Sequence, residues 1–471
     1  MAEDGKLHVV MFPWLAFGHM IPFLEFSKLI AQKGHKISFV STPRNIDRLP
    51  KIPSTSSSLI NFIKLPLPHL DSLPENAEAT IDVPYHKVHH LKTAFDGLQT
   101  ELTQFLKASA PDWVIYDFAP HWLPPIASEL GISRAFFSLF NAWTGSFFGS
   151  SITDGRASRK SMEDFTVPPE WVPFPSTVAF RLHEIKRFRN TGAEESASSV
   201  SDWVRFRSAV VACDVFLIRT CTELEPEWLG LLQDLHRKPL LPVGLLPPSS
   251  RISAAEDDDQ VNTWHTIKAW LDKQEEESVV YVALGSEVTP SQDELTELAR
   301  GLEQSGLRFF WALRKWHGSA EFHSFELPVG FEERTKGRGI VCTSWAPQVK
   351  ILAHDSVGGF VTHCGWSSVI EGLQHGRPLL MLPFLGDQGL NARALAEMEV
   401  GIEIPRDEED GSLSQDLVAE SLRLVMVDSE GRAYINKAKE MKAIFGDMNL
   451  QNRYTDNAVE YLQKHKHLHK D

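Results

Sequence analysis

The sequence of 471 residues has little cysteine, no excess of basic charge and no long apolar run. Its 4 cysteines form no C-x-x-C pair, and no N-x-S/T glycosylation sequon occurs. This argues against a disulfide scaffold or a cysteine-rich metal site, so we expect a reducing, cytoplasmic location. No segment is apolar for long enough to span a bilayer, and the N-terminus lacks the pattern of a secretion signal. We therefore expect no membrane insertion.

The charge balance excludes another class of partners. A formal net charge of −15 argues against nucleic-acid binding, which depends on basic contacts to phosphate, and against anionic membrane surfaces. The acidic run at residues 256–260 resembles a D-x-D metal motif, and His465, His467 and His469 stand in a polar tail. Solvated charge is the commoner explanation of both patterns, so we predict no metal site.

The length predicts more than one domain, and the pattern favours parallel α/β sheets. Strand patterns at residues 7–14, 36–42, 113–118 and 134–140 alternate with helical ones, among them residues 20–33. Residues 241–262 are rich in proline, serine and acidic residues without either periodicity, which is typical of a linker. We predict a first domain over 1–240, this linker, a second α/β domain over 263–445, and a C-terminal helix with a polar tail over 446–471.

The stretch from Trp345 to Gln388 places polar residues directly after short apolar strands. The strand at residues 359–362 leads through His363 into a helix that we expect to begin near Ser367. Free amides at a helix N-terminus bind anions, so His363, Ser367 and Ser368 are candidates to hold a diphosphate. Ser367 as an ordinary helix cap is the alternative.

The same stretch offers partners for the rest of a sugar nucleotide. Glu371 suits the hydroxyls of a ribose, and Trp345 offers a flat face to a base whose edge meets the backbone of Ala346. Asp387 and Gln388 follow a strand and suit the hydroxyls of a sugar ring. Simple packing of the tryptophan and an ordinary turn at Asp387 are the alternatives to each feature alone, and the combination favours a sugar-nucleotide site.

The whole stretch, with its WAPQ start, HCGW core and DQ end, resembles the signature of plant family 1 UDP-sugar glycosyltransferases. The N-terminal segments FPWLAFGHMIPF and YDFAPHW resemble a branch rich in enzymes that add a sugar to an existing glycoside. The resemblance implies a GT-B fold, in which two Rossmann-like doubly wound domains face across a cleft and the C-terminal helix returns to the first domain. It also implies UDP-sugar as co-substrate, and neither a resident cofactor nor a metal.

The resemblance assigns a role to each matching position of the donor site. Trp345 would stack on uracil and Ala346 would contact it, Gln348 and Glu371 would hold the ribose, His363, Ser368 and Ser286 would bind the diphosphate, and Trp366, Asp387 and Gln388 would face the sugar. Ser367 stands where the family usually has asparagine, which shortens one contact.

The reaction chemistry is expected from the first half of the chain. His19 lies in the expected loop between the first strand and the first helix, and Asp117 ends another strand. Histidine is the natural base for a hydroxyl group, and a carboxylate fixes its tautomer. The resemblance gives these two residues those roles and implies a single displacement with inversion. His121 is the main competitor for a catalytic role.

The substrates are less determined by the sequence. Glucose is favoured as the donor sugar for two reasons. Trp366 stands where a plant glucuronosyl enzyme would have arginine, and Gln388 stands where histidine would favour galactose. Rhamnose and xylose stay open as alternatives. The acceptor is expected to be a flavonoid or terpenoid, or a glycoside of one, with small phenolic or xenobiotic aglycones as the alternative. The candidate acceptor residues are aromatic or polar: Trp14, Phe17, Phe118, Trp122, Asn141 and Trp143. We expect a monomer.

Two other functions fit parts of the pattern. A nicotinamide-dependent dehydrogenase also uses doubly wound sheets, but no G-x-G-x-x-G follows the expected first strands. A non-catalytic sugar-nucleotide binder could share the fold, since a fold does not determine function. The presence of both His19 and Asp117 argues against that reading.

Overall fold

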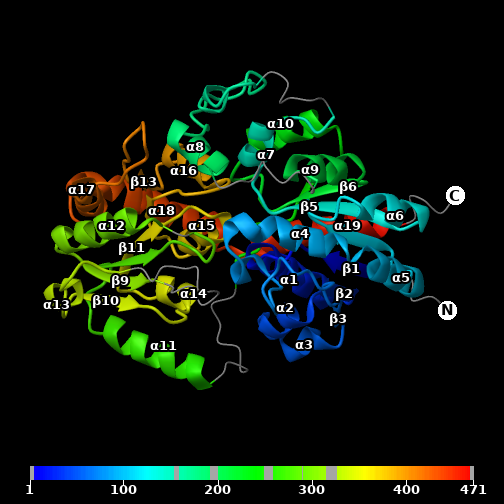
Figure 1. The fold of residues 1–471 in the computed structure, drawn as a ribbon, viewed down its shortest axis with the longest axis horizontal. Helices are drawn as coiled ribbons and strands as arrows, with labels where there is room; N and C mark the ends of the chain where they lie inside the picture. The colour runs from blue at the N-terminus through cyan, green and yellow to red at the C-terminus, as the bar shows by residue number, and fades with distance from the viewer. Residues whose placement is uncertain are drawn as a thin grey trace. The chain divides into compact units, whose positions relative to one another are not determined.

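The computed structural model describes residues 5–152, 159–190, 200–248, 258–288, 290–313 and 326–466. Two compact units make up the chain (Figure 1). Unit 1 comprises Met1–Arg159, Arg189–Leu246 and Met448–Asp471, and unit 2 comprises Lys160–Phe188 and Pro247–Asp447.

Unit 1 is built on a parallel sheet of seven strands in the order β3-β2-β1-β4-β5-β6-β7. Its strands are β1 His8–Phe12, β2 Lys36–Ser41, β3 Ile60–Lys64, β4 Trp113–Tyr116, β5 Ser133–Ser138, β6 Val215–Ile218 and β7 Leu240–Pro242. The inner strands β4 and β6 consist wholly of buried apolar residues, as expected for strands that are covered on both faces. Along β1, Val10 and Phe12 belong to one buried cluster while Val9 and Met11 belong to another, so the sheet separates two cores.

The helices of unit 1 cover both faces of this sheet. They are α1 Phe17–Gln32, α2 Pro43–Arg48, α3 Ser54–Ser57, α4 Val88–Asp96, α5 Gln99–Ser109, α6 Leu123–Glu129, α7 Ala142–Phe148, α9 Asp202–Val211, α10 Pro226–His236 and α19 Met448–Lys464.

Unit 2 contains a parallel sheet of six strands in the order β10-β9-β8-β11-β12-β13. Its strands are β8 Val279–Ala283, β9 Arg308–Ala312, β10 Gly339–Cys342, β11 Val357–Thr362, β12 Leu379–Met381 and β13 Gly401–Glu403. Its helices are α8 Leu182–Asn190, α11 Asp258–Leu271, α12 Gln292–Ser305, α13 Phe331–Arg334, α14 Gln348–Leu352, α15 Trp366–Leu373, α16 Gln388–Glu397, α17 Gln415–Met426 and α18 Arg432–Phe445. Helix α8 crosses the unit boundary, which lies after Phe188.

The alternation of strand and helix expected from the sequence is present, but several boundaries differ. The first helix begins at Phe17, so His19 lies in its first turn instead of in a loop. Residues 240–242 form the edge strand β7, which overlaps the start of the expected linker. The middle of that linker, residues 249–257, lies outside the described residues, as do His467 and His469.

One segment belongs to a different unit than expected. Residues 160–188 were expected in the first domain, and they pack in unit 2. Glu184 and Arg187 of this segment form ion pairs with Arg393 and Glu294 of unit 2. These partners lie more than a hundred positions away in the sequence, so no local periodicity indicates the pairing.

The C-terminal helix α19 returns to unit 1, as expected. The backbone carbonyl of Leu462 accepts a hydrogen bond of 2.9 Å from the indole of Trp113 in β4, and the leucine side chain is fully buried. Gln451 is also fully buried, and its Oε1 accepts a hydrogen bond from the backbone N–H of Leu245. Figure 1 shows the red helix among the blue and cyan elements of the unit.

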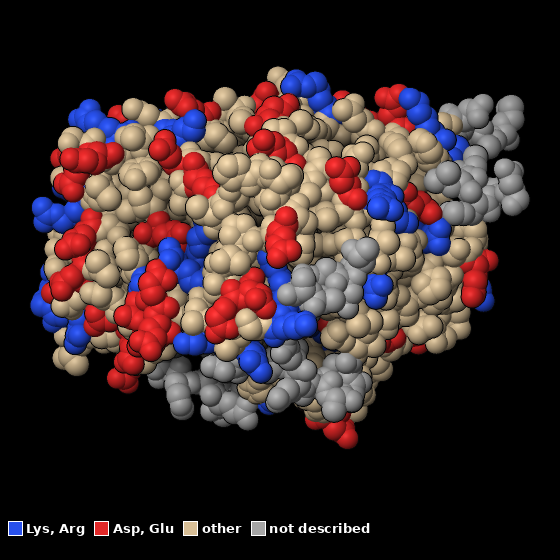
Figure 2. Space-filling model, turned by 90° about the horizontal axis from the view of Figure 1, so that it is seen from above, with Lys and Arg blue, Asp and Glu red and all other residues tan. Residues whose placement is uncertain are grey.

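The surface carries charges of both signs. On the face shown in Figure 2, acidic and basic side chains are interspersed. Within the part of the chain that the structure describes, no helix is both long and apolar enough to cross a membrane.

The packing of α19 predicts the effect of truncating Leu462. Leu462→Ala should lower the free energy of unfolding of unit 1 by about 2–5 kcal/mol, because it leaves a cavity in a closed core. Urea denaturation followed by tryptophan fluorescence measures this loss. Lys464→Ala on the exposed side of the same helix is the control, with an expected change below about 0.5 kcal/mol. Equal stability of the two variants would show that α19 does not contribute to this core.

Candidate functional site

The strand order of each unit reverses at one place. In unit 1 the reversal lies between β1 and β4, and in unit 2 it lies between β8 and β11. Ligands of open α/β sheets bind outside the carboxyl ends of the strands at such reversals. His19 and Asp117 follow β1 and β4, while Ser286 and His363 follow β8 and β11. The topology therefore places the candidate residues of each unit where that unit can bind a ligand.

His19 and Asp117 are brought together although 98 positions separate them. Nδ1 of His19 lies 2.8 Å from Oδ2 of Asp117, whose side chain is only 2% exposed. The backbone N–H groups of Trp14 and Ala119 also donate to this carboxylate, at 2.7 and 3.1 Å. With Nδ1 bonded to the fixed carboxylate, Nε2 of His19 is the ring nitrogen that can take a proton.

His121, the alternative candidate, belongs to a different network. Its Nδ1 lies 3.2 Å from Nη1 of Arg205, a fully buried side chain that is paired with Asp96. Burial and then the charge of Arg205 lower the pKa of His121. The carboxylate of Asp96 is 3.9 Å from the His121 ring and is bonded to Arg205. His121 therefore lacks the direct carboxylate partner that His19 has.

The candidate acceptor residues divide into buried and partly exposed ones. Trp143 is fully buried, and Asn141 caps α7 by accepting a hydrogen bond from the backbone of Thr144, so both are structural in this conformation. Trp14 and Trp122 are nearly buried and belong to the core beneath the site.

The side chains of Phe17 and Phe118 are partly exposed to solvent. The ring centroid of Phe118 lies 5.7 Å from that of His19, and Nζ of Lys92 lies 6.0 Å from the Phe118 ring. Of the six candidates, Phe118 is the one for which a ring contact with His19 is observed.

In unit 2, the two residues expected to hold a ribose form one hydrogen-bonded cluster with Ser368, which was expected at the diphosphate. Nε2 of Gln348 donates to Oε2 of Glu371 at 2.6 Å and to Oγ of Ser368 at 3.2 Å. The hydroxyl of Tyr281 in β8 donates to Oε1 of the same glutamine at 3.2 Å. Ser368 and Glu371 are three residues apart on α15, which puts them on one face of the helix. Tyr281 was not anticipated, because a tyrosine in a buried strand has no local signal of such a contact.

The N-terminus of α15 is the candidate anion site of unit 2. Its N-cap is Gly365, which provides no side-chain cap, so the alternative of Ser367 as the cap is wrong. Cys364 adopts a left-handed φ of 66° and turns the chain from β11 into the helix. The backbone amides of the first turn therefore point toward the carboxyl edge of the sheet.

His363 is held in a space that two glycines leave open. A Cβ atom at either Gly285 or Gly365 would lie 2.5 Å from its Nε2, so neither position accepts a larger residue without displacing the ring. Nδ1 of His363 is buried and has no hydrogen-bond partner among the described residues. Burial lowers the pKa of His363 to about 4. At neutral pH this histidine is uncharged, and it can contribute a hydrogen bond but not a positive charge.

The two signature tryptophans are placed differently. Trp345 is 43% exposed and presents a free ring surface, as base stacking requires, and Ala346 beside it is nearly buried. Trp366 is 4% exposed, and its ring packs against Phe445 at 6.2 Å. The indole of Trp366 therefore does not present a face to a sugar in this conformation, although its backbone amide begins α15.

The last part of the signature is a tight turn before α16. Oε1 of Gln388 accepts hydrogen bonds of 2.9 Å from the backbone N–H groups of Phe384 and Leu385. Oδ2 of Asp387 accepts one of 2.7 Å from Asn391, which also donates to the carbonyl of Cys364. Asn391 thus ties this turn to the HCGW turn. Its role was not anticipated, because it lies three residues beyond the signature.

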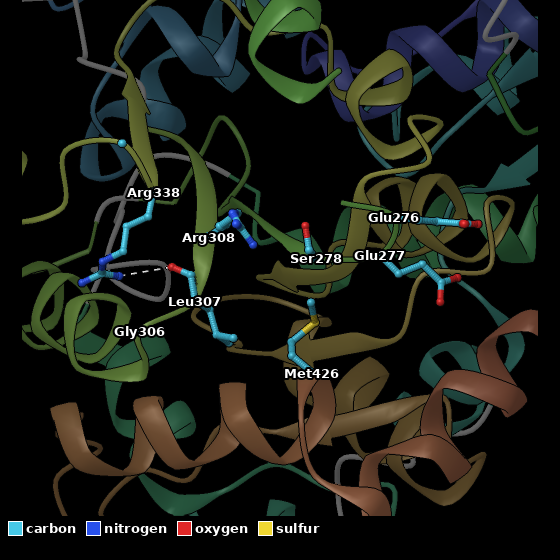
Figure 3. Close-up of a pocket in the computed structure, with 9 residues that line it drawn as sticks. Glu276, Glu277, Ser278, Gly306, Leu307, Arg308, Arg338 and Met426 are labelled. Carbon is cyan, nitrogen blue, oxygen red and sulfur yellow. Dashed lines mark hydrogen bonds between the residues drawn. The ribbon is translucent and has the colours of Figure 1, made fainter. Parts of the chain in front are cut away.

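A cavity of about 510 Å³ in unit 2 lies at the opposite edge of the sheet (Figure 3). Its lining residues Ser278, Leu307 and Arg338 precede β8, β9 and β10. This is the amino edge of the strands, away from Ser286 and His363, so we do not assign it to the site. Over the described residues, no group of three or more histidine, cysteine or acidic side chains is arranged to hold a metal ion.

Comparisons with known proteins agree with this geometry. A family model for UDP-glucoronosyl and UDP-glucosyl transferase matches residues 193–467. UDP-glycosyltransferase 91C1 of Arabidopsis thaliana is 53% identical over 98% of this chain and 97% of its own length. Soyasaponin III rhamnosyltransferase of Glycine max is 45% identical over 99% of this chain and 97% of its own. The structure of Phytolacca americana UGT2 complexed with UDP-2fluoro-glucose and pterostilbene has a TM-score of 0.73 and 26% identity, covering 97% of this chain and 100% of that one.

The matches extend over nearly the whole chain, and they confirm both the resemblance of the signature stretch and the GT-B architecture of two parallel-sheet α/β domains. UDP-sugar is the co-substrate of this family. The chain belongs to the plant family 1 UDP-glycosyltransferases and is an enzyme of that class.

Proposed function

We propose that this enzyme transfers a hexose, with glucose favoured, from a UDP-sugar to a hydroxyl group of a plant specialised metabolite, with inversion and without a metal. The observation that carries the proposal is the bond of 2.8 Å between His19 and the buried Asp117. A histidine in this arrangement is a base whose tautomer is fixed and whose protonated form is stabilised by the carboxylate.

The proposed reaction is a single displacement. Nε2 of His19 takes the proton of the acceptor hydroxyl while its oxygen attacks the anomeric carbon. The bond between that carbon and the β-phosphate oxygen breaks, and UDP leaves with the electron pair. Asp117 stabilises the imidazolium until it releases its proton to solvent. The amides of α15 and an N–H of the neutral His363 stabilise the charge of UDP by hydrogen bonding.

The donor sugar is assigned from the turn before α16. Because Oε1 of Gln388 is bonded to the backbone, its amide nitrogen is the group that can donate to a sugar hydroxyl, and Asp387 offers an acceptor. A donor beside an acceptor suits a ring with adjacent hydroxyl groups, which glucose, rhamnose and xylose all have. Glucose is favoured because position 388 is glutamine, where histidine would favour galactose. Rhamnose is the second candidate, since a relative that is 45% identical is named a rhamnosyltransferase. Xylose is also kept as an alternative.

The acceptor is proposed to be a flavonoid or terpenoid, free or already carrying a sugar. Phe118 beside His19 supports a flat or hydrophobic acceptor, and the relative from Glycine max bears the name of a saponin. Small phenolic or xenobiotic aglycones are the alternative. We place the reaction in the cytosol, because the four cysteines are free and three of them are buried.

The assignment of His19 predicts a separation of chemistry from binding. His19→Ala should lower kcat by about 10²–10⁴-fold, which is the contribution that general base catalysis makes. The affinity for UDP, measured by calorimetry, should stay within about twofold because UDP binding does not use the base. His69→Ala, at a ring that is 86% exposed, is the control with wild-type turnover. Normal turnover by His19→Ala would reject the assignment.

The proposed stabilisation of UDP by amides and His363 predicts independence from divalent cations. Turnover measured after dialysis against excess EDTA should equal that of the untreated enzyme. Loss of activity that added Mg²⁺ or Mn²⁺ restores would contradict this and direct attention to the acidic run at residues 256–260.

The donor and acceptor are tested together by a panel read by mass spectrometry. UDP-glucose, UDP-rhamnose and UDP-xylose are each offered with flavonoid and terpenoid aglycones and with their glucosides. We expect the highest kcat/KM with UDP-glucose, the sugar that the family resemblance favours at Trp366 and Gln388. A preference for UDP-rhamnose would support the second candidate. No product with any donor would favour a sugar-nucleotide binder without activity.

A further inference from the structure

Helix α8 contacts both ends of the turn that carries Asp387 and Gln388. Residues 182–188 of this helix belong to the segment 160–188, which is far from the signature in sequence but in the same unit. The turn runs from Phe384 to Gln388, and Gln388 is the first residue of α16. No part of the family signature includes α8.

The first contact is at the beginning of the turn. The guanidinium of Arg187 lies 5.1 Å from the ring centroid of Phe384, and that of Arg406 lies 4.8 Å from it. Both arginines donate to Glu294, at 2.6 and 2.8 Å. Burial alone would raise the pKa of Glu294, but the two arginines hold it below its ordinary value, so the glutamate stays ionised at neutral pH. Phe384 is therefore held by two cations that a common carboxylate keeps in position.

The second contact is at the end of the turn. Oε2 of Glu184 lies against Gly389, where an added Cβ atom would be only 2.4 Å away. The same oxygen accepts a hydrogen bond of 2.5 Å from Nη2 of Arg393, and both side chains are 7% exposed. Arg393 also pairs with Glu403, the last residue of β13. A carboxylate over the first turn of α16 is favourable because the helix dipole is positive there.

These contacts leave little freedom to the residues between them. Gln388 folds back onto the backbone of Phe384 and Leu385, so a shift of Phe384 moves the amide that faces the sugar. Gly386 has a φ of 62°, in the left-handed region that favours glycine, and it has no side chain that could pack against its neighbours. Apart from the bond between Asn391 and Asp387, the turn is held at its two ends, and α8 contacts both.

We propose that α8 is a brace of the sugar-recognition turn, with Glu184 and Arg187 as positioning residues that set donor affinity and sugar selectivity through Phe384 and Gly389 without touching the UDP-sugar. This inference rests on the proposed role of Asp387 and Gln388. It makes sugar selectivity depend on a segment from the first half of the chain.

The test compares Glu184→Gln and Arg187→Met with Glu397→Gln. Glu397 is the matched control, because it accepts a hydrogen bond of 2.7 Å from Thr177 of the same segment at the far end of α16. In the first two variants KM for UDP-glucose should rise by about 5- to 30-fold, the effect of losing one or two kcal/mol of positioning. Both kcat and the Kd of UDP should stay within about twofold. Selectivity for UDP-glucose over UDP-xylose should fall with the rise in KM.

Hydrogen exchange of the unliganded protein provides the second readout. Amides of residues 384–395 should exchange faster in Glu184→Gln and Arg187→Met than in wild type, and at the wild-type rate in Glu397→Gln. If Arg187→Met does not fold, Arg187→Lys takes its place with the same expected direction. Unchanged KM and unchanged exchange in folded variants would overturn the brace, as would an equal effect of Glu397→Gln.

The two proposals fail in distinguishable ways. If the wild-type enzyme turns over no UDP-sugar, the proposed function fails, and hydrogen exchange still decides whether α8 restrains the turn. If wild type transfers sugar and the variants differ from it only in melting temperature, the proposed function stands and the brace is rejected.

Discussion

The site depends on a constraint of parallel sheets. A parallel pair of strands needs a crossover connection, so within each sheet all strands end at the same edge of that sheet, and the loops that follow them gather there. At the reversal in unit 1 this brings His19 and Asp117 within a hydrogen bond, although they are distant in sequence. At the reversal in unit 2 it places His363 and Ser286 on neighbouring strand ends. The side chains do the chemistry, and the strand order determines which of them meet.

The electrostatics of the two units differ in kind. In unit 1 a buried carboxylate, held by two backbone amides, orients a partly exposed imidazole that can accept a proton. In unit 2 the proposed anion site relies on neutral groups, namely the amides at the N-terminus of α15, whose N-cap is a glycine, and a histidine whose burial lowers its pKa to about 4. The proposed stabilisation of UDP therefore comes from hydrogen bonds and the helix dipole instead of a charged side chain.

Local sequence was sufficient where function depends on spacing along one element. Ser368 and Glu371 share a helix face, and the structure bonds both of these candidate donor-site residues to Gln348, a third one. Local sequence was insufficient where tertiary packing decides. The burial of Trp366 against Phe445 and of Trp143 in unit 1 depends on distant partners. The same holds for α8, whose ion pairs connect it to residues in the second half of the chain.

The central claim is a single displacement in which His19 acts as the base. The anomeric configuration of the product, measured by proton NMR of the purified glycoside, tests it most directly, because one displacement inverts the reacting carbon. With UDP-glucose, whose sugar is α-linked, the account predicts a β-glucoside. An α-glucoside would contradict it and require a second displacement or a different chemistry.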